Sequence, residues 1–303
     1  MTSTATLRFG FDLGGTKIAG IAFGPDDQVL AETRRATPRE DYAGTIAALV
    51  AMAADMRNRA GGHGSVGIGI PGSPSPVDRR IQNANSTWLN GQQFQDDLER
   101  ALGQPVRLAN DANCFALSEA SDGSAIDAAI VFGVILGTGC GGGIVIDGKI
   151  VDGPRGIGGE WGHTPLPRPD SCEIPGPGCW CGRSGCMETW VSGPAVASDH
   201  KRLSGQSLTT EEIVQRASSG DANANATLER FTDRLARGLA GVTNIIDPDV
   251  IVLGGGLSSI AALYATLPEL MRPHIFADHP NITIRPPKWG AASGVRGAAR
   301  LWP

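Results

Sequence analysis

The chain of 303 residues has no uninterrupted apolar run of about 18 residues, the length that a helix needs to cross a bilayer. Its N-terminus also lacks a basic stretch followed by an apolar one, which is the pattern of a secretory signal. Lys and Arg form no dense run and the net charge is −5, so the clustered cations that neutralise nucleic-acid phosphates are missing. We therefore expect a cytoplasmic protein with neither a membrane nor a nucleic acid as partner.

Two common nucleotide-binding signatures are absent as well. No glycine loop ends in Gly-Lys-Ser/Thr, the phosphate loop of many NTPases, and none combines Gly-x-Gly-x-x-Gly with a following helix, as in dinucleotide-binding folds. The chain is nevertheless long enough to form two domains of ordinary size. The two folds that carry these signatures are therefore disfavoured, and the chain is large enough to be an enzyme of another fold.

One histidine and three closely spaced cysteines supply four soft or borderline donors: His163, Cys179, Cys181 and Cys186. Four such donors close a tetrahedral structural zinc site and leave no position for substrate. A disulfide or a set of buried thiols is the alternative, and Cys172 could compete as a ligand. The spacing predicts a metal that holds a loop, and thiol ligands favour the cytoplasm.

Two carboxylates, Glu160 and Glu188, lie beside these ligands in the sequence. A loop held by zinc would present both carboxylates as fixed hydrogen-bond acceptors. We therefore expect a polyhydroxylated ligand next to the metal loop.

Two strand-turn-strand units of the same design are visible. Apolar, β-prone segments at 7–12 and 18–23 flank a glycine turn, which is a hairpin signal. A second unit has strands at 130–136 and 144–146 around the glycine-rich segment 137–143. The repeat suggests two similar α/β halves that present their glycine loops to one cleft.

Helices alternate with short apolar strands in the rest of the chain. A helix is predicted over 42–59 and a buried strand over 66–70. Apolar residues recur on one face of a long helix over 228–246, and a strand is predicted over 250–253. This alternation is typical of the α/β class.

The two glycine loops are suited to phosphate. Glycine lets backbone N–H groups approach phosphate oxygens, and Thr16 and Thr138 add hydroxyl donors. Asp12 is placed to hold magnesium, directly or through water, whereas Lys17 contacts phosphate or is solvated. For either loop alone, a tight turn without ligand is the alternative. The predicted phosphate-side residues are Gly10, Asp12, Gly14, Gly15, Thr16, Lys17, Gly137, Thr138, Gly139 and Gly141.

A third glycine turn follows the strand predicted over 250–253. A glycine turn between a buried strand and a helix offers flat backbone surface for a purine and ribose, and a close packing turn is the alternative. Gly254, Gly255 and Gly256 are therefore the predicted adenosine-side residues.

Asp111 follows a predicted strand over 106–108 and opens an alanine-rich helix. An Asp in this place is a helix N-cap or a general base, and one residue can serve as both. In phosphoryl transfer to an alcohol, a carboxylate orients the attacking hydroxyl and takes its proton. Asp111 is the candidate base.

In order along essentially the whole chain, these motifs resemble the ROK family of repressors, open-reading-frame proteins and sugar kinases. Within the family, the chain most resembles bacterial fructokinases that also accept mannose. The general resemblance lies in 12–16, 110–113, 137–139, 160–163, 179–188 and 253–256, and the fructokinase resemblance in 83–91, 108–114 and 293–299.

The resemblance implies an α/β protein with an actin-like ATPase (ribonuclease H-like) fold, two α/β domains around a cleft and a homodimer. We expect a smaller domain over 1–118, to which 287–303 returns, and a larger one over 119–286 with the zinc loop and the adenosine-side turn. The implied activity is transfer of the γ-phosphoryl group of MgATP to the 6-hydroxyl of D-fructose, and also of mannose. A glucokinase, an N-acetylglucosamine kinase or a non-catalytic sugar sensor is the alternative.

The resemblance also assigns residues. It implies that Asp111 is the base and that His163, with the three cysteines, binds structural zinc while its ring also faces the sugar. The implied sugar contacts are Asn110, Asp111, Glu160, His163 and Glu188, completed by Gly72 and by Asn83 or Asn85.

Repressors of the family carry an N-terminal helix-turn-helix of several dozen residues. Only six residues precede Leu7 here, so a repressor is not expected. A non-catalytic relative is expected to lack Asp111 or a phosphate loop, and this chain has both. We therefore expect a kinase that uses ATP, Mg²⁺ and structural Zn²⁺.

Overall fold

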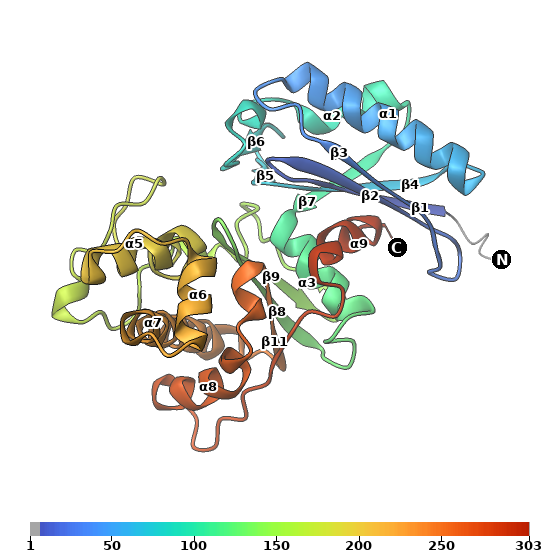
Figure 1. Cartoon of the computed structure of the whole chain (residues 1–303). Coiled ribbons are helices and arrows are strands. Elements are labelled where there is room, and N and C mark those ends of the chain that lie inside the picture. Colours follow the sequence, from blue (N-terminus) through green and yellow to red (C-terminus); the bar gives the residue numbers. More distant parts are fainter. Residues whose placement is uncertain (1–6, 303) are drawn as a thin grey trace.

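The computed structural model describes residues 7–302, which form two separate five-stranded sheets with helices packed against them (Figure 1). The first sheet has the order β3-β2-β1-β4-β7. Its β1 pairs antiparallel with β2 and parallel with β4, so the predicted first hairpin is confirmed. The strands are β1 Leu7–Leu13, β2 Lys17–Phe23, β3 Val29–Ala36, β4 Gly64–Ile70 and β7 Val106–Asn110.

Helices cover both faces of the first sheet. On one face lie α1 (Tyr42–Ala60), which the sequence predicted within one residue, and α2 (Phe94–Leu102). Asp41 caps α1 by accepting a hydrogen bond from Gly44 N, and Gly61 ends the helix with a φ of 78°. On the other face lies α9 (Ser293–Ala299), which returns from the end of the chain.

The second sheet has the order β10-β9-β8-β11-β12. Its β8 pairs antiparallel with β9 and parallel with β11, so the second predicted hairpin is also present. The strands are β8 Ile130–Leu136, β9 Cys140–Ile146, β10 Lys149–Ile150, β11 Val250–Gly254 and β12 Ile284–Arg285.

A large apolar core lies on one face of the second sheet. Phe132 and Leu136 of β8 pack there with Phe231 and Leu235 from the predicted face of the long helix α7. Asp247 ends α7 in a left-handed conformation, with a φ of 45°. The helices on this side are α4 Glu188–Val191, α5 Gly193–Ser204, α6 Thr210–Ser218, α7 Ala222–Ile246 and α8 Ala262–Met271.

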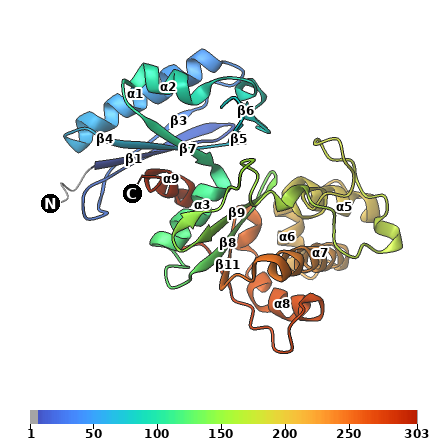
Figure 2. The same ribbon diagram turned by 180° about the vertical axis from the view of Figure 1, so that it is seen from behind.

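Helix α3 (Asp111–Ser121) packs on the opposite face of the second sheet and also against α9. Figure 2 shows these two helices between the sheets. A Cβ at Gly297 would lie 1.7 Å from the carbonyl oxygen of Cys114, so the two helices approach at a position that only glycine permits. The predicted division into domains at residues 118 and 119, with 287–303 returning to the first, stays a prediction.

The second glycine loop is shorter than predicted. Cys140–Gly143 belong to β9 and pair with β8, so the turn contains only residues 137–139. Glycine is needed in the strand because neighbours approach closely: a Cβ at Gly143 would lie 2.4 Å from the carbonyl oxygen of Ala112. Gly141 is therefore a strand residue.

Gly10 was predicted as a phosphate-side residue, and the structure places it within a strand. It lies inside β1, paired on both sides, and a Cβ there would meet the carbonyl oxygen of Val295 in α9 at 2.3 Å. Gly10 therefore allows α9 to pack on the sheet.

A two-stranded hairpin, β5 (Ser73–Pro74) and β6 (Ile81–Gln82), follows β4. Gln82 Nε2 donates to the carbonyl oxygen of Arg155, which belongs to the loop after β10. This hairpin therefore touches the part of the chain built on the second sheet. Among the helices of residues 7–302, none has both the length and the apolar character of a membrane span.

Candidate active site

A cleft of about 390 Å³ is lined by residues from the ends of β4, β7 and β8 and from the loop before α4. It brings together every residue that the sequence predicted for the sugar, although these are spread over more than a hundred positions of the chain. They are Gly72, Asn83, Asn85, Asn110, Asp111, Glu160, His163 and Glu188.

Asp111 is held at the point where β7 becomes α3. Asn110 is the N-cap of this helix: its Oδ1 accepts from Ala112 N at 2.9 Å, and its Nδ2 donates to the carbonyl oxygen of Gly72 at 3.2 Å. The N-cap role that the sequence left open for Asp111 thus belongs to its neighbour. Asp111 is the first helical residue, and its Oδ1 accepts from Ala112 N at 2.8 Å.

The surroundings of Asp111 favour a protonated carboxyl. Burial is the main cause that raises the pKa of Asp111 to about 7, and the nearby carboxylates of Asp12 and Glu160 contribute to this rise against the hydrogen bond from Ala112. Burial likewise raises the pKa of Asp12 to about 6, opposed by the charge of Lys17. A carboxyl with a pKa near neutrality can accept a proton and release it again, as a general base must.

Glu188 is fixed by two donors. Its Oε2 accepts from Cys140 N at 2.9 Å and its Oε1 accepts from the indole Nε1 of Trp180 at 2.7 Å. A Cβ at Gly139 would lie 2.7 Å from Oε2, so a larger residue there would force the Glu188 carboxylate to shift. The pKa of Glu160 is raised above its ordinary value, because burial outweighs the opposing effect of His163.

The four predicted metal ligands converge. One donor atom from each of His163, Cys179, Cys181 and Cys186 lies within 4.8 Å of the others. Sγ of Cys181 and Sγ of Cys186 are 3.6 Å apart, far beyond the roughly 2.05 Å of a disulfide. Two thiolates on tetrahedral zinc, with Zn–S near 2.3 Å, lie about 3.8 Å apart, so the donor set fits zinc.

All six cysteines are free, which removes the disulfide alternative within this structure. Cys172 is exposed and is not in the cluster, so the structure does not support it as a competing ligand.

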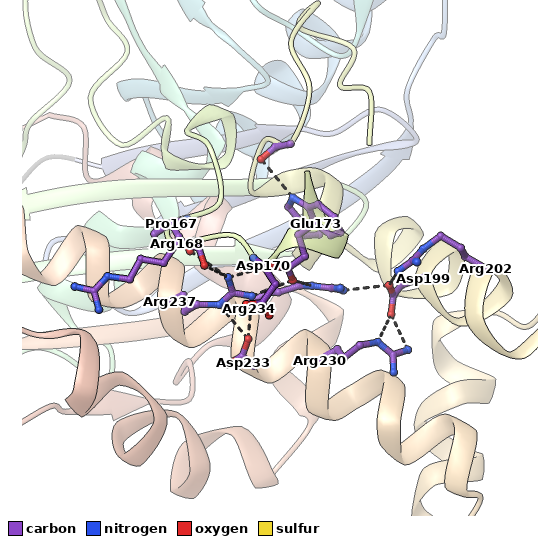
Figure 3. Close-up of polar contacts among 12 residues, drawn as sticks. Pro167, Arg168, Asp170, Glu173, Asp199, Arg202, Arg230, Asp233, Arg234 and Arg237 are labelled. Carbon is purple, nitrogen blue, oxygen red and sulfur yellow. Dashed lines mark hydrogen bonds and ion pairs between the residues drawn. The ribbon is translucent and has the colours of Figure 1, made fainter. Parts of the chain in front are cut away.

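Buried ion pairs hold the loop that carries these ligands. Glu173 lies between Arg234 and Arg237 of α7: Nε of Arg234 donates to its Oε1 at 2.7 Å, and Nη2 of Arg237 donates to the same oxygen at 3.0 Å (Figure 3). Nη1 of Arg237 also donates to the carbonyl oxygen of Arg168 at 2.9 Å. Asp199 of α5 pairs with Arg234 at 3.2 Å and extends the network. The loop is thereby fixed to the core of the second sheet.

Removing the charge of Glu173 is expected to destabilise this part of the protein. Glu173→Gln leaves two buried arginines short of a carboxylate, so we expect the free energy of unfolding to fall by about 3–5 kcal/mol in a guanidinium titration. Asp233→Asn is the matched control, because Asp233 is 51% exposed and pairs with the same Arg237. An exposed pair contributes at most about 1 kcal/mol. Equal losses in the two variants would contradict this account.

The same ion pairs give a pH dependence. Burial raises the pKa of Glu173, but hydrogen bonds from Arg237 and Arg234 outweigh it and lower the pKa to about 2 from its ordinary 4.5. The stabilisation is therefore present above pH 4.5 and is lost as the pH falls toward 2.

The first glycine turn does not line this cleft. Gly14 N donates to the carbonyl oxygen of Lys17 at 3.0 Å, which closes the turn between β1 and β2. Gly15, Thr16 and Lys17 are exposed. Asp12 is half-buried near the end of β1, close to Asp111.

A second cleft of about 750 Å³ adjoins the first, and Gly137 and Thr138 line both. Of the third glycine turn, only Gly256 lines it. A Cβ at Gly254 would meet the Phe115 ring at 2.6 Å, and one at Gly255 would meet the backbone of Leu136 at 2.3 Å, so both are packing glycines.

Several lining residues were not predicted from the sequence. Trp180 lines the first cleft from between two metal ligands, where the Cys-x-Cys spacing could have drawn attention to it. Thr210 and Val214 of α6 line the second cleft, and no motif marks this helix.

Comparisons with known proteins agree with this architecture. Residues 8–303 match the ROK family. The N-acetyl-D-glucosamine kinases of Yersinia enterocolitica and Salmonella paratyphi C are each 41% identical over 299 residues, covering 97% of this chain and 99% of the relative.

Solved structures show the same fold. The ROK hexokinase of Thermus thermophilus superposes with a TM-score of 0.85 at 33% identity, covering 97% of this chain and 96% of that one. A ROK family glucokinase from Streptomyces griseus, in complex with glucose and AMPPNP, gives 0.77 at 27% identity, covering 97% and 98%. The predicted actin-like ATPase fold is thus confirmed. By its sequence match over 8–303 and by its fold, the chain belongs to the ROK family.

Proposed function

We propose that this ROK family sugar kinase transfers the γ-phosphoryl group of ATP to the 6-hydroxyl of N-acetyl-D-glucosamine. The observation that carries the reaction is a half-buried carboxyl, Asp111, in a cleft whose other walls carry Asn110, Glu160, His163 and Glu188. The family resemblance of the sequence favoured D-fructose, with N-acetylglucosamine among the alternatives. The relatives at 41% identity are N-acetyl-D-glucosamine kinases, which supports the alternative.

Asp111 would act on the attacking hydroxyl. Hydrogen bonding to the carboxylate orients the 6-hydroxyl, and the carboxylate takes its proton as the bond to phosphorus forms. Glu160 and Glu188 would accept hydrogen bonds from ring hydroxyls at the other side of the cleft. Because Glu188 already accepts from Cys140 N and Trp180 Nε1, its orientation is set before the sugar arrives.

ATP would occupy the second cleft, with its phosphates at the residues that both clefts share, Gly137 and Thr138. In this arrangement Gly256 lies on the adenosine side, and the γ-phosphate points toward Asp111. The exposed turn with Gly14, Gly15 and Thr16 would approach the phosphates when the two halves close, which would also exclude water.

Two metals fit residues of this chain. Asp12 would hold Mg²⁺ beside the phosphates, where the ion neutralises charge that develops during transfer. His163 and the three cysteines would hold Zn²⁺, which when bound fixes the loop that carries Trp180 and Glu188. We also retain the homodimer and the cytoplasmic location as predictions.

The test is sugar-dependent ADP release with purified protein and MgATP. The panel contains N-acetylglucosamine, N-acetylmannosamine, glucose, mannose and fructose, with no sugar as the blank. We expect kcat/KM for N-acetylglucosamine to exceed that for fructose by at least about tenfold. A higher value for fructose would favour the fructokinase interpretation. An absence of turnover on every sugar would favour the non-catalytic alternative.

Activity should fall in mild acid. Because the proton acceptor must be ionised and burial raises the pKa of Asp111 to about 7, we expect kcat/KM to fall about tenfold per pH unit below that value. The neighbouring Asp12 and Glu160 carboxyls titrate with it, so the apparent value belongs to the group. A pH–rate profile from 5.5 to 9, with circular dichroism to exclude unfolding, measures this. A flat profile would contradict the role of Asp111.

The indole of Trp180 is expected to matter through Glu188. Trp180→Phe keeps an aromatic ring but removes the Nε1–H that donates to Glu188 Oε1 at 2.7 Å. Loss of one such charge-assisted bond should raise KM for the sugar by roughly 5–20-fold and leave KM for ATP within about twofold. Trp302→Phe is the control, because its Nε1 donates to Val66 O, away from both clefts. An equal rise in both KM values would exclude this positioning role.

A further inference from the structure

An apolar groove adjoins the sugar cleft and has no role in the reaction proposed above. Its volume is about 1030 Å³, and it shares Asn83, Glu160, His163 and Trp180 with the sugar cleft. The rest of its wall is mostly apolar and includes Ile144, Ile157, Val242 and Ile245. The side chains of Ile157 and Ile245 are 45% and 82% exposed, so the groove is accessible to a ligand.

The groove meets the sugar cleft at a wall that the base does not line. Gly72, Asn110 and Asp111 line the sugar cleft but not the groove. The residues that line both cavities belong instead to the 160–163 segment, the metal loop and the turn after β6.

The geometry of a hexopyranose then decides which substituent faces the groove. C2 lies across the ring from C5, the atom that carries the 6-hydroxymethyl group. A ring that places its 6-hydroxyl at Asp111 therefore directs its 2-substituent away from Asp111, toward His163 and Trp180, which line both cavities.

We propose that this groove is an acyl subsite that receives the group on the 2-amino nitrogen of the hexose. The inference rests on the proposed function and names the part of the protein that selects a 2-acylamino sugar. An acetamido group has an amide, which can pair with the side-chain amide of Asn83 at the shared wall, and a methyl group, which can lie on the apolar lining near Ile157.

The size of the groove leads to an unusual consequence. An acetyl group fills only a small part of about 1030 Å³, so longer acyl chains have room to extend along the apolar wall. Each added methylene that reaches this wall improves binding by up to about fourfold, and a closed pocket would reject it instead. The enzyme should therefore tolerate longer N-acyl chains.

The first experiment compares glucosamine derivatives with N-acetyl, N-propanoyl and N-butanoyl groups, together with glucose. We expect kcat/KM for the two longer derivatives to stay within about fivefold of that for N-acetylglucosamine or to exceed it. A fall of about 100-fold at N-propanoyl or N-butanoyl would overturn the subsite.

A second experiment fills the groove. Ile157→Trp adds a large ring at a half-exposed position in the groove, and Ile126→Trp is the matched control at an isoleucine that is 64% exposed and lines neither cavity. We expect Ile157→Trp to weaken N-butanoyl-glucosamine at least about tenfold in kcat/KM and in nucleotide-free calorimetric binding. Glucose should change by less than about threefold, and Ile126→Trp should change neither sugar. An equal loss for glucose, or no loss for the acyl sugar, overturns the inference.

The experiments distinguish an incorrect acyl subsite from an incorrect proposed function. Turnover of N-acetylglucosamine without tolerance of longer chains overturns the subsite and leaves the proposed function in place. Turnover of glucose or fructose with no turnover of any N-acyl sugar overturns the proposed function and the subsite together.

Discussion

Asp111→Asn is expected to lower kcat by roughly 10²–10⁴-fold, because the amide cannot take the proton of the attacking hydroxyl. Sugar binding should change by less than about tenfold. The asparagine keeps the size of the side chain and can still accept from Ala112 N, which donates to Asp111 Oδ1 in the native protein. The rate is measured as ADP release, and sugar affinity by calorimetry without nucleotide.

The thermal stability of Asp111→Asn serves as the control for a damaged fold. Burial raises the pKa of Asp111 to about 7, so ionisation of this carboxyl costs folding free energy that increases as the pH rises above its ordinary 3.8. A neutral asparagine removes that cost, and the variant should melt at an equal or higher temperature than the native protein at pH 8. A slow variant that is also less stable would indicate a damaged fold. Full activity would eliminate Asp111 as the base.

Loss of one metal ligand is expected to have the second largest effect. Cys181→Ser breaks the four-donor set whose atoms lie within 4.8 Å of one another. The loop that carries Trp180 and Glu188 should loosen, so we expect sugar affinity to fall by about 10–100-fold. KM for ATP should change by less than about threefold, because none of the four ligands lines the second cleft.

Cys172→Ser is the matched control, because Cys172 is exposed and lies outside the cluster. Metal content, calorimetric sugar affinity and the rate of proteolysis within 160–190 are measured for both variants and for chelator-treated protein. We expect metal loss, weaker sugar binding and faster cleavage only in Cys181→Ser and after chelation. Normal sugar binding by metal-free protein would show that the metal does not support the sugar site.

Features that depend on local spacing were predictable from the sequence. The hairpins, α1 and the face of α7 follow from patterns over a few neighbouring residues. The convergence of Cys179, Cys181 and Cys186 is likewise local, since glycines at 182 and 185 let the chain turn back within eight positions.

The roles of individual glycines were less predictable. A glycine beside a strand can face a ligand or a packed helix, and the sequence pattern does not distinguish these cases. Gly10 faces α9, which comes from the far end of the chain, and Gly254 faces Phe115 of α3. Gly143 was assigned to a loop because glycine runs usually mark turns, but it lies in β9, where α3 approaches closely.

Two parts of the site depend on contacts between distant segments. The raised pKa of Asp111 comes first from burial, and the charge of Asp12 adds to it because the sheet order β1-β4-β7 brings the two residues close together. The identity of the preferred sugar also could not be predicted from the motifs that family members share. In our account it depends on the groove next to the sugar cleft, and the walls of this groove come from a loop and from α7.

The most direct test of the central claim is the identity of the product. N-acetylglucosamine and MgATP are incubated with the native protein and with Asp111→Asn, and the sugar product is examined by phosphorus–proton correlated NMR. We predict a single phosphate coupled to the protons on C6 with the native protein, and no detectable product over the same time with Asp111→Asn. A phosphate on C1, or equal product from the variant, would contradict the account.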